Sequence, residues 1–229
     1  VLAWHLREGG ALERAAPYAL RAGRRAARLA AWHEAIEHFE HALEGTRALT
    51  EQPPILAALA DAELNAGQAA LAVDHLRRAV HLSRDPAQDA ALRLELARAY
   101  FTLSRFGEAQ ALAAELVDQG STLMANARAE LLWGTALSVE GADLDAAGVH
   151  LERAAALTSA CPNVDRAFLA QTQFERGGLA AQQGDLNSAI DFYRQALGIA
   201  SEDAELAVWE VLSHNNLAYH LHLSGSDAA

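Results

Sequence analysis

The feature that most constrains the fold is a recurring triplet of small, large and small residues. The large residue stands four positions after the first small one, and the last member follows three positions later, although the third triplet exchanges the sizes of its last two members. The five triplets are Ala35, Phe39 and Ala42; Ala72, Leu76 and Ala79; Ala109, Ala113 and Leu116; Ala147, Leu151 and Ala154; and Ala189, Tyr193 and Ala196. Their last members are 37 to 42 residues apart, which is the period of stacked helical hairpins.

A spacing of four and then three residues places all members of a triplet on one face of a helix. We therefore expect the triplets to be packing seams between helices. Turn signals precede them, and a glycine in such a turn, as at Gly67, Gly141, Gly184 and Gly225, supplies the positive φ that ends a helix. An aspartate that follows the glycine, such as Asp185, can cap the next helix.

These signals predict an all-α fold, a right-handed superhelical solenoid of antiparallel helix pairs formed by a single domain over residues 1–229. The predicted helices are 1–8, 11–29, 32–45, 54–66, 69–82, 87–103, 106–119, 122–140, 143–158, 164–183, 186–199 and 202–223. They group into repeats at 11–45, 54–82, 87–119, 122–158 and 164–199, with a partial repeat at 202–229. Pro53, Pro54, Pro86 and Pro162 fall between hairpins, where proline stops helices, whereas Pro17 could kink or start its helix.

Composition indicates in which compartment the protein folds and works. The chain is 52% hydrophobic with only 5 Pro, which suits a folded helical protein. Its one cysteine, Cys161, excludes an internal disulfide and favours a reducing compartment. No apolar run or signal peptide is evident, so we expect a cytoplasmic protein without membrane contact. The start at Val1 and the helical pattern interrupted at Ala229 suggest a piece of a longer polypeptide.

Charge is distributed unevenly along the chain. The net charge is −12, with +1 over residues 1–50, −2 over 51–100 and −11 over the remainder, which disfavours direct binding to nucleic acid. The predicted helix 11–29 nevertheless carries Arg14, Arg21, Arg24, Arg25 and Arg28. They could bind an acidic partner, a phosphate or nucleic acid, but we favour a solvated face that pairs with Glu13, Glu34 and Glu37.

No residue pattern supports catalysis, a cofactor or a metal. His33 and His38 are five residues apart, about 140° around a helix, whereas zinc ligation on a helix uses a spacing of four. His38 with His41, and His214 with His220 or His222, could share a face but lack suitably spaced carboxylate or thiol ligands. Because no phosphate loop or nucleophile elbow occurs either, we predict that the chain is not an enzyme.

The triplets, the small residue upstream and the turn glycine together resemble the tetratricopeptide repeat, most closely at Gly177, Gly184, Ala189, Tyr193 and Ala196. The resemblance covers about residues 11–225. The repeat period exceeds the usual 34, the first-helix tryptophan is mostly absent, and Leu116 replaces an alanine.

A second resemblance lies at the N-terminus, in residues 2–6, 13–23 and 34–39. These segments are similar to the repeats that follow the ATPase core in large bacterial signalling proteins, including LuxR-type regulators and antibiotic regulatory proteins. In those proteins the repeats sense an inducer or a partner protein.

In tetratricopeptide arrays the first helix of each hairpin lines the concave groove. The resemblance therefore implies a ligand or partner groove at Arg24, Arg28, Asp61, Asn65, Arg98, Phe101, Thr135, Phe174, Gln182, Asn215 and Tyr219. We expect a non-catalytic interaction or sensor module of a larger bacterial regulatory protein that binds a peptide or partner domain. The alternative is a receptor for a small-molecule inducer that controls a nucleotide-dependent transcription regulator.

Because Leu217, Leu221 and Leu223 lack a polar cap, self-association through the C-terminal end is also predicted.

Overall fold

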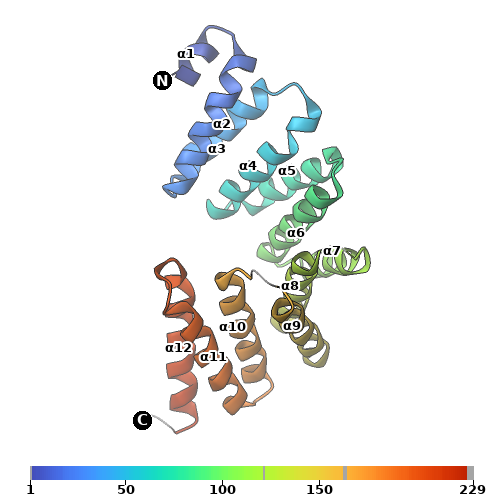
Figure 1. Cartoon of the computed structure of the whole chain (residues 1–229), viewed down its shortest axis with the longest axis vertical. Helices are drawn as coiled ribbons and strands as arrows, with labels where there is room; N and C mark the ends of the chain where they lie inside the picture. The colour runs from blue at the N-terminus through green and yellow to red at the C-terminus, as the bar shows by residue number, and fades with distance from the viewer. Residues whose placement is uncertain (1, 121, 162–163, 226–229) are drawn as a thin grey trace. The chain divides into compact units, whose positions relative to one another are not determined.

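The computed structural model describes residues 2–120, 122–161 and 164–225 (Figure 1). Within these ranges the chain forms twelve α-helices, two short 3-10 helices and no strand. The α-helices are α1 Leu2–Glu8, α2 Leu12–Arg28, α3 Trp32–Gly45, α4 Pro53–Asn65, α5 Ala69–Leu82, α6 Pro86–Thr102, α7 Phe106–Asp118, α8 Leu123–Glu140, α9 Leu144–Ser159, α10 Arg166–Gln182, α11 Leu186–Ala200 and α12 Ala207–Leu223. The 3-10 helices are η1 Leu49–Glu51 and η2 Ala204–Leu206.

The all-α prediction is confirmed, and each predicted helix has a counterpart in the structure. The largest difference is at α12, which begins at Ala207 and not at residue 202. The Asp203 carboxylate accepts a hydrogen bond from the Glu205 backbone nitrogen at 3.0 Å. This cap begins the 3-10 helix η2, which precedes α12. α2 continues through Pro17, so this proline does not start the helix.

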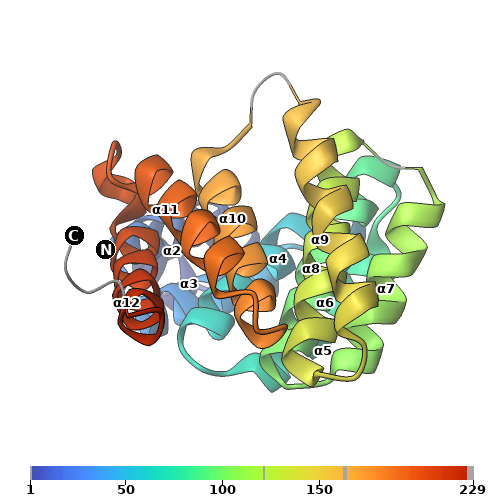
Figure 2. The same cartoon turned by 90° about the horizontal axis from the view of Figure 1, so that it is seen from below.

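The chain divides into two compact units, residues 1–112 and 113–229, and each is described by itself. In the first unit, α2 pairs with α3 and α4 pairs with α5, while α3 contacts α4 and α5 contacts α6. In the second unit, α8 pairs with α9 and α10 pairs with α11. Figure 2 shows α11 beside both α10 and α12, which are the helices it contacts. Both units are therefore built from consecutive helix pairs.

The triplets form the packing seams between helices, as predicted. All fifteen of their side chains are 2% exposed or less. In three hairpins the large residue packs against a glycine of the preceding helix. A Cβ added at Gly23 would lie 2.7 Å from the Phe39 ring, and one at Gly177 would lie 2.8 Å from the Tyr193 ring. Glycine at these positions permits close approach of the two helices.

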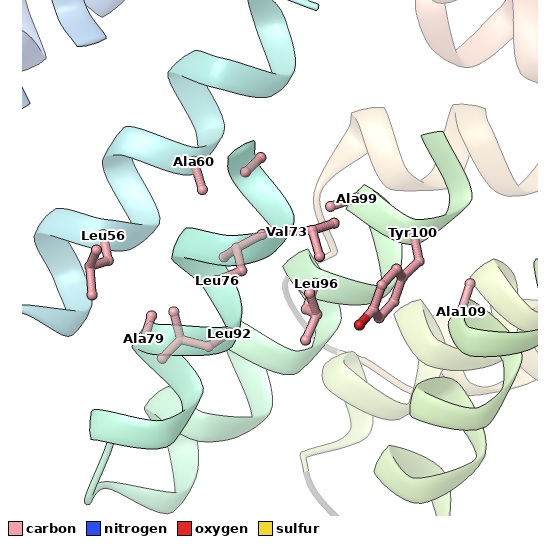
Figure 3. Packing of buried hydrophobic residues seen from close by; sticks show 11 residues of the cluster. Leu56, Ala60, Val73, Leu76, Ala79, Leu92, Leu96, Ala99, Tyr100 and Ala109 are labelled. Carbon is pink, nitrogen blue, oxygen red and sulfur yellow. The ribbon is translucent and has the colours of Figure 1, made fainter. Parts of the chain in front are cut away.

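The core of the first unit shows how one helix pair packs on the next (Figure 3). Leu56 of α4, Leu76 of α5 and Leu92 of α6 are 3% exposed or less and belong to one apolar cluster that also contains Tyr100. Full burial of a leucine side chain stabilises a fold by roughly 1.5–3 kcal/mol. This cluster holds α4, α5 and α6 as one rigid support for their exposed side chains.

The turns that end helices also follow the prediction. Gly67, Gly141, Gly184 and Gly225 have φ values of 78°, 70°, 83° and 71°, in the left-handed region that glycine adopts without strain. Asp185 caps α11 by accepting a hydrogen bond from the Ser188 backbone nitrogen at 3.1 Å. Asp185 thus fixes where α11 begins, whereas α3 and α5 begin without a side-chain cap.

Two hairpin turns reach the same conformation without glycine. Ala30, between α2 and α3, has φ of 55°, and Ser104, between α6 and α7, has φ of 57°. A left-handed conformation costs a non-glycine residue roughly 1–2 kcal/mol. The hairpin turn is therefore kept at both positions despite an unfavourable residue.

Candidate functional site

The predicted binding residues of the first unit lie on α2, α4 and α6. Arg24, Arg28, Asp61 and Asn65 are exposed. The Asn65 side-chain amide donates a hydrogen bond to the Asp61 backbone oxygen at 2.8 Å and lies 3.5 Å from the Asp61 carboxylate. The structure therefore brings Asp61 and Asn65 into one polar pair at the C-terminal end of α4.

The predicted residues of α6 are partly engaged by neighbours. Arg98 is exposed, and its guanidinium donates to the Glu95 carboxylate at 2.6 Å. Phe101 is half-buried, and its ring packs edge-on against Phe106 with centroids 5.4 Å apart. Arg98 can still reach a ligand by exchanging its carboxylate partner, whereas Phe101 contributes mainly to helix packing.

In the second unit, Gln182, Asn215 and Tyr219 are exposed on α10 and α12. Phe174 is half-buried, with its ring centroid 5.5 Å from that of Tyr193 and 5.7 Å from that of Trp209. It therefore joins α10 to α11 and α12.

Thr135 does not fit the predicted role. It is 8% exposed on α8, and its hydroxyl has no hydrogen-bond partner among the residues that the structure describes. Leu131 and Ser138, one turn to either side, are also buried. Contacts from both α9 and α10 cover α8, so this helix offers none of these side chains to a ligand.

A hollow of about 550 Å³ lies between α2, the segment after α3 and the start of α4. Ala16, Pro17, Leu20, Pro54 and Ile55 supply its apolar lining. Its polar lining includes Glu13, Glu51 and Arg47, and the guanidinium of Arg47 lies 2.5 Å from the Glu13 carboxylate. The hollow thus combines an apolar wall with charged groups.

The arginines of α2 are not paired as we expected. Glu13 pairs with Arg47, and the Glu34 carboxylate lies 3.7 Å from His38. In the described part of the chain, none of the five α2 arginines has a carboxylate partner. The predicted pairing with Glu13, Glu34 and Glu37 is therefore wrong, whereas the exposure of the five arginines agrees with the solvated face that we favoured.

A second hollow, of about 510 Å³, is lined by Arg7, Glu44 and residues of α3, α4 and α5. His41 contacts Arg7, and burial together with the Arg7 charge lowers the pKa of His41. His75 also lines this hollow, and its Nδ1 lies 2.9 Å from a carboxylate oxygen of Glu63, which is 1% exposed. This hydrogen bond raises the pKa of His75.

The second unit contains a similar pair that sequence reasoning missed. His150 Nδ1 lies 2.6 Å from a carboxylate oxygen of Glu130, and Trp133 stacks on the imidazole with ring centroids 4.0 Å apart. His38, His75 and His150 each directly precede the large residue of a triplet. That shared register was the available signal, although it does not identify the carboxylate.

Glu175 of α10 is a second group that the sequence did not reveal. Burial raises the pKa of its carboxyl group to about 7. Burial and the Glu175 charge together raise the pKa of Tyr193 to about 12. No sequence signal marked Glu175, because a single glutamate on a helix has the same pattern whether it is buried or solvated.

The polar groups of the last hollow are satisfied within the protein. A third hollow, of about 270 Å³ between α9 and α10, is lined by Thr158, Thr172 and Arg176. Both hydroxyls donate to backbone oxygens of their own helices, and Arg176 donates to Glu152 at 2.6 Å. Across the described residues, no group of three or more His, Cys, Asp or Glu could hold a metal ion. Cys161 is a half-buried free thiol.

This architecture is that of helical-repeat proteins of the tetratricopeptide kind. Residues 170–203 match the tetratricopeptide repeat family, and they span α11 and most of α10. No curated protein matches the chain by sequence. In the described ranges, no helix is both long and apolar enough to cross a bilayer.

Several solved structures share the fold. A thermophilic TPR protein of Thermus thermophilus is 22% identical with a TM-score of 0.64, and the match covers 87% of this chain and 99% of that one. The apo form of RapI is 16% identical with a TM-score of 0.70, covering 93% and 92%. A Rap protein complexed with Competence and Sporulation Factor is 17% identical with a TM-score of 0.70, covering 92% and 64%.

Proposed function

We propose that the chain is a non-catalytic interaction module that binds a peptide or partner domain along the exposed side of its first helices. The observation that carries this proposal is the exposure of polar side chains on α2, α4, α6, α10 and α12, while the triplets of the second helices are buried. A rigid scaffold with adaptable polar side chains favours binding because little ordering is needed. The Rap protein solved with Competence and Sporulation Factor supports binding by this fold.

We further place the module in a larger cytoplasmic regulatory protein of bacteria, active in signalling or transcription, with residues 1–229 as a single solenoid. The similarity of residues 2–6, 13–23 and 34–39 to the repeats of ATPase-linked regulators supports this setting. In such a protein, partner binding to the repeats would shift the population of a switch in another domain.

The alternative function is a receptor for a small-molecule inducer. The hollow of about 550 Å³ favours it, because small-ligand sites typically measure about 300–1,000 Å³ and combine apolar walls with a few polar groups. Calorimetric titration with metabolite fractions tests this alternative. Ala48 lines the hollow, and an Ala48→Trp variant places a large side chain there. Saturable heat of binding that disappears in this variant would favour the inducer receptor.

Site-specific photocrosslinking tests the leading proposal. A photoreactive residue at Asn65, Gln182 or Asn215 is expected to capture a partner in cells, because these side chains are exposed on first helices. The same residue at His81 or Asp191, exposed on second helices, is the matched control. Equal capture at both sets, or capture at the control positions alone, would contradict binding along the first helices.

We also propose self-association through α12. Leu223 is exposed as expected, whereas Leu217 and Leu221 are half-buried. Other exposed apolar side chains of this helix are Val208, Val211 and Tyr219, which are 68%, 58% and 59% exposed.

A further inference from the structure

The arginines of α2 differ from most arginines of the other elements. Ten arginines on other elements lie within 4 Å of a carboxylate, at 2.5 to 3.9 Å. None of the five on α2 does so among the described residues, although the chain carries 30 acidic side chains. Of the eight arginines without a carboxylate within 4 Å among the described residues, α2 carries five. Arg77 and Arg78 of α5 donate instead to Tyr100 and Gln52, and Arg84 is the eighth.

Four of these five arginines share one face of α2 with a tyrosine. We call this face the basic stripe, and it consists of Arg14, Tyr18, Arg21, Arg25 and Arg28. At 100° per residue these positions fall within about 80° of arc, and at 1.5 Å per residue the stripe is about 21 Å long. All five side chains are exposed, and the buried residues of α2 point to the opposite side. A ligand that follows the helix axis could contact every member.

An aromatic ring and an apolar hollow accompany the charge. The Arg21 guanidinium lies 4.7 Å from the centroid of the Tyr18 ring, so the two form a flat cationic surface. Pro17 and Leu20, on the adjacent edge of α2, line the hollow of about 550 Å³. A ligand on the stripe could therefore place an apolar side chain between α2 and α4.

Two observations favour an acidic protein segment over nucleic acid. The net charge of −12 repels a long polyanion, whereas a short segment interacts mainly with the charges it touches, because the Debye length at physiological salt is about 8 Å. The stripe also has the repeat of a helix face, so carboxylates spaced along a second helix match its guanidinium groups.

We propose that the basic stripe of α2 docks an acidic, helix-forming segment of a partner protein, with one apolar side chain of that segment in the hollow between α2 and α4. This proposal rests on the proposed function and deepens it by naming the chemistry of the partner. Its own determinants, Arg14, Arg21 and Arg25, lie outside the predicted groove set.

Fluorescence anisotropy with synthetic probes tests the proposal. The first probe is a labelled peptide of about 20 residues with glutamates at i, i+4 and i+7 spacing and one central leucine; the second has the same composition in scrambled order; the third is oligothymidylate of similar charge. We expect the first probe to bind most tightly, with an affinity that falls as salt increases.

The combined variant Arg14→Gln, Arg21→Gln, Arg25→Gln is expected to weaken binding of the first probe by about tenfold or more, because three exposed contacts are lost. The matched control, Arg105→Gln, Arg166→Gln, Arg194→Gln, removes the same charge from arginines that already have carboxylate partners. It should change the affinity less than about twofold, since those arginines lie outside α2, at the turn before α7 and on α10 and α11. Circular dichroism checks that both variants are folded.

Three results would overturn the proposal: no binding of the first probe, equal weakening by both variants, or tighter binding of oligothymidylate. The last result would make the stripe a nucleic-acid surface. Failure of the proposed function is separately visible, because photocrosslinking at Gln182 and Asn215 does not involve α2. Loss of crosslinking with retained probe binding would leave the stripe as an isolated docking site.

Discussion

Single residues decide how closely the helices of a pair approach. The large member of a triplet contacts the helix before it, and at Gly23, Gly134 and Gly177 a side chain as small as a methyl group would come within 2.8 Å of the facing residue. Gly198, by contrast, lies in α11 with no atom near its missing Cβ. Gly177 of α10 and Gly198 of α11 thus differ in what surrounds them, although both are glycines inside a helix.

Gly177→Ala is expected to destabilise the protein by about 1–3 kcal/mol, because the added methyl group forces Tyr193 or the α10 backbone to move. Gly198→Ala is the control and should stabilise it by about 0.5–1 kcal/mol, because alanine favours a helix interior and meets nothing there. Urea unfolding followed by circular dichroism measures both. Equal changes in the free energy of unfolding, in the same direction, would mean that the contact between residue 177 and Tyr193 does not determine the effect.

Ala30→Gly should stabilise the protein, whereas a glycine introduced inside a helix usually destabilises it. Ala30 has φ of 55°, and glycine removes the cost of that conformation, so a gain of about 1 kcal/mol in the free energy of unfolding is expected. Ala27→Gly, inside α2 one turn earlier, should instead cost about 1 kcal/mol. A loss of stability at both positions in thermal melts would refute the argument from the left-handed turn.

At the scale of helices, periodic features could be predicted and isolated ones could not. The triplets and turn glycines recur in one register, so their burial and their turns followed from the sequence. Glu63 and Glu130 are 1% and 3% exposed, yet each is a single carboxylate on a helix, and its histidine partner lies on the next helix. Thr135 was misplaced because a single threonine on a helix has the same sequence pattern whether it is exposed or, as here, buried.

Glu175 gives this helix packing a pH dependence. Its pKa is raised from 4.5 to about 7, so between these values the folded protein holds a proton that the unfolded chain has released. Folding stability is therefore higher at the acidic end of this range and falls as pH rises toward 7. Glu175→Gln should remove this slope and stabilise the protein above pH 7 by on the order of 2 kcal/mol.

Urea midpoints measured from acidic to neutral pH check this expectation. Glu205→Gln is the control, because Glu205 is exposed on η2 and should leave the slope unchanged. A Glu175→Gln protein whose stability still falls between pH 4.5 and 7, as the native protein should, would show that another group titrates there.

At the scale of the whole molecule, each helix of a stack needs neighbours to cover its apolar face. In the described part of the chain, α12 has packing partners in α11, α10 and η2. Ser213 and His220 face them and are buried. Val208, Val211, Leu212 and Tyr219 lie on the other side at helical spacing, between 37% and 68% exposed. Contiguous apolar exposure of this kind is typical of an interaction surface.

The combined variant Val208→Glu, Val211→Glu tests association through this face. The native protein is expected to form dimers as its concentration rises, because pairing two α12 faces removes these side chains from water, whereas the variant should stay monomeric since each dimer would bury four added charges. Leu71→Glu, Val149→Glu is the matched control, with side chains 51% and 50% exposed on α5 and α9. Light scattering over a concentration series distinguishes the cases. A native protein that remains monomeric throughout would exclude self-association at α12, and a control that loses dimers as fully as the variant would place the interface elsewhere.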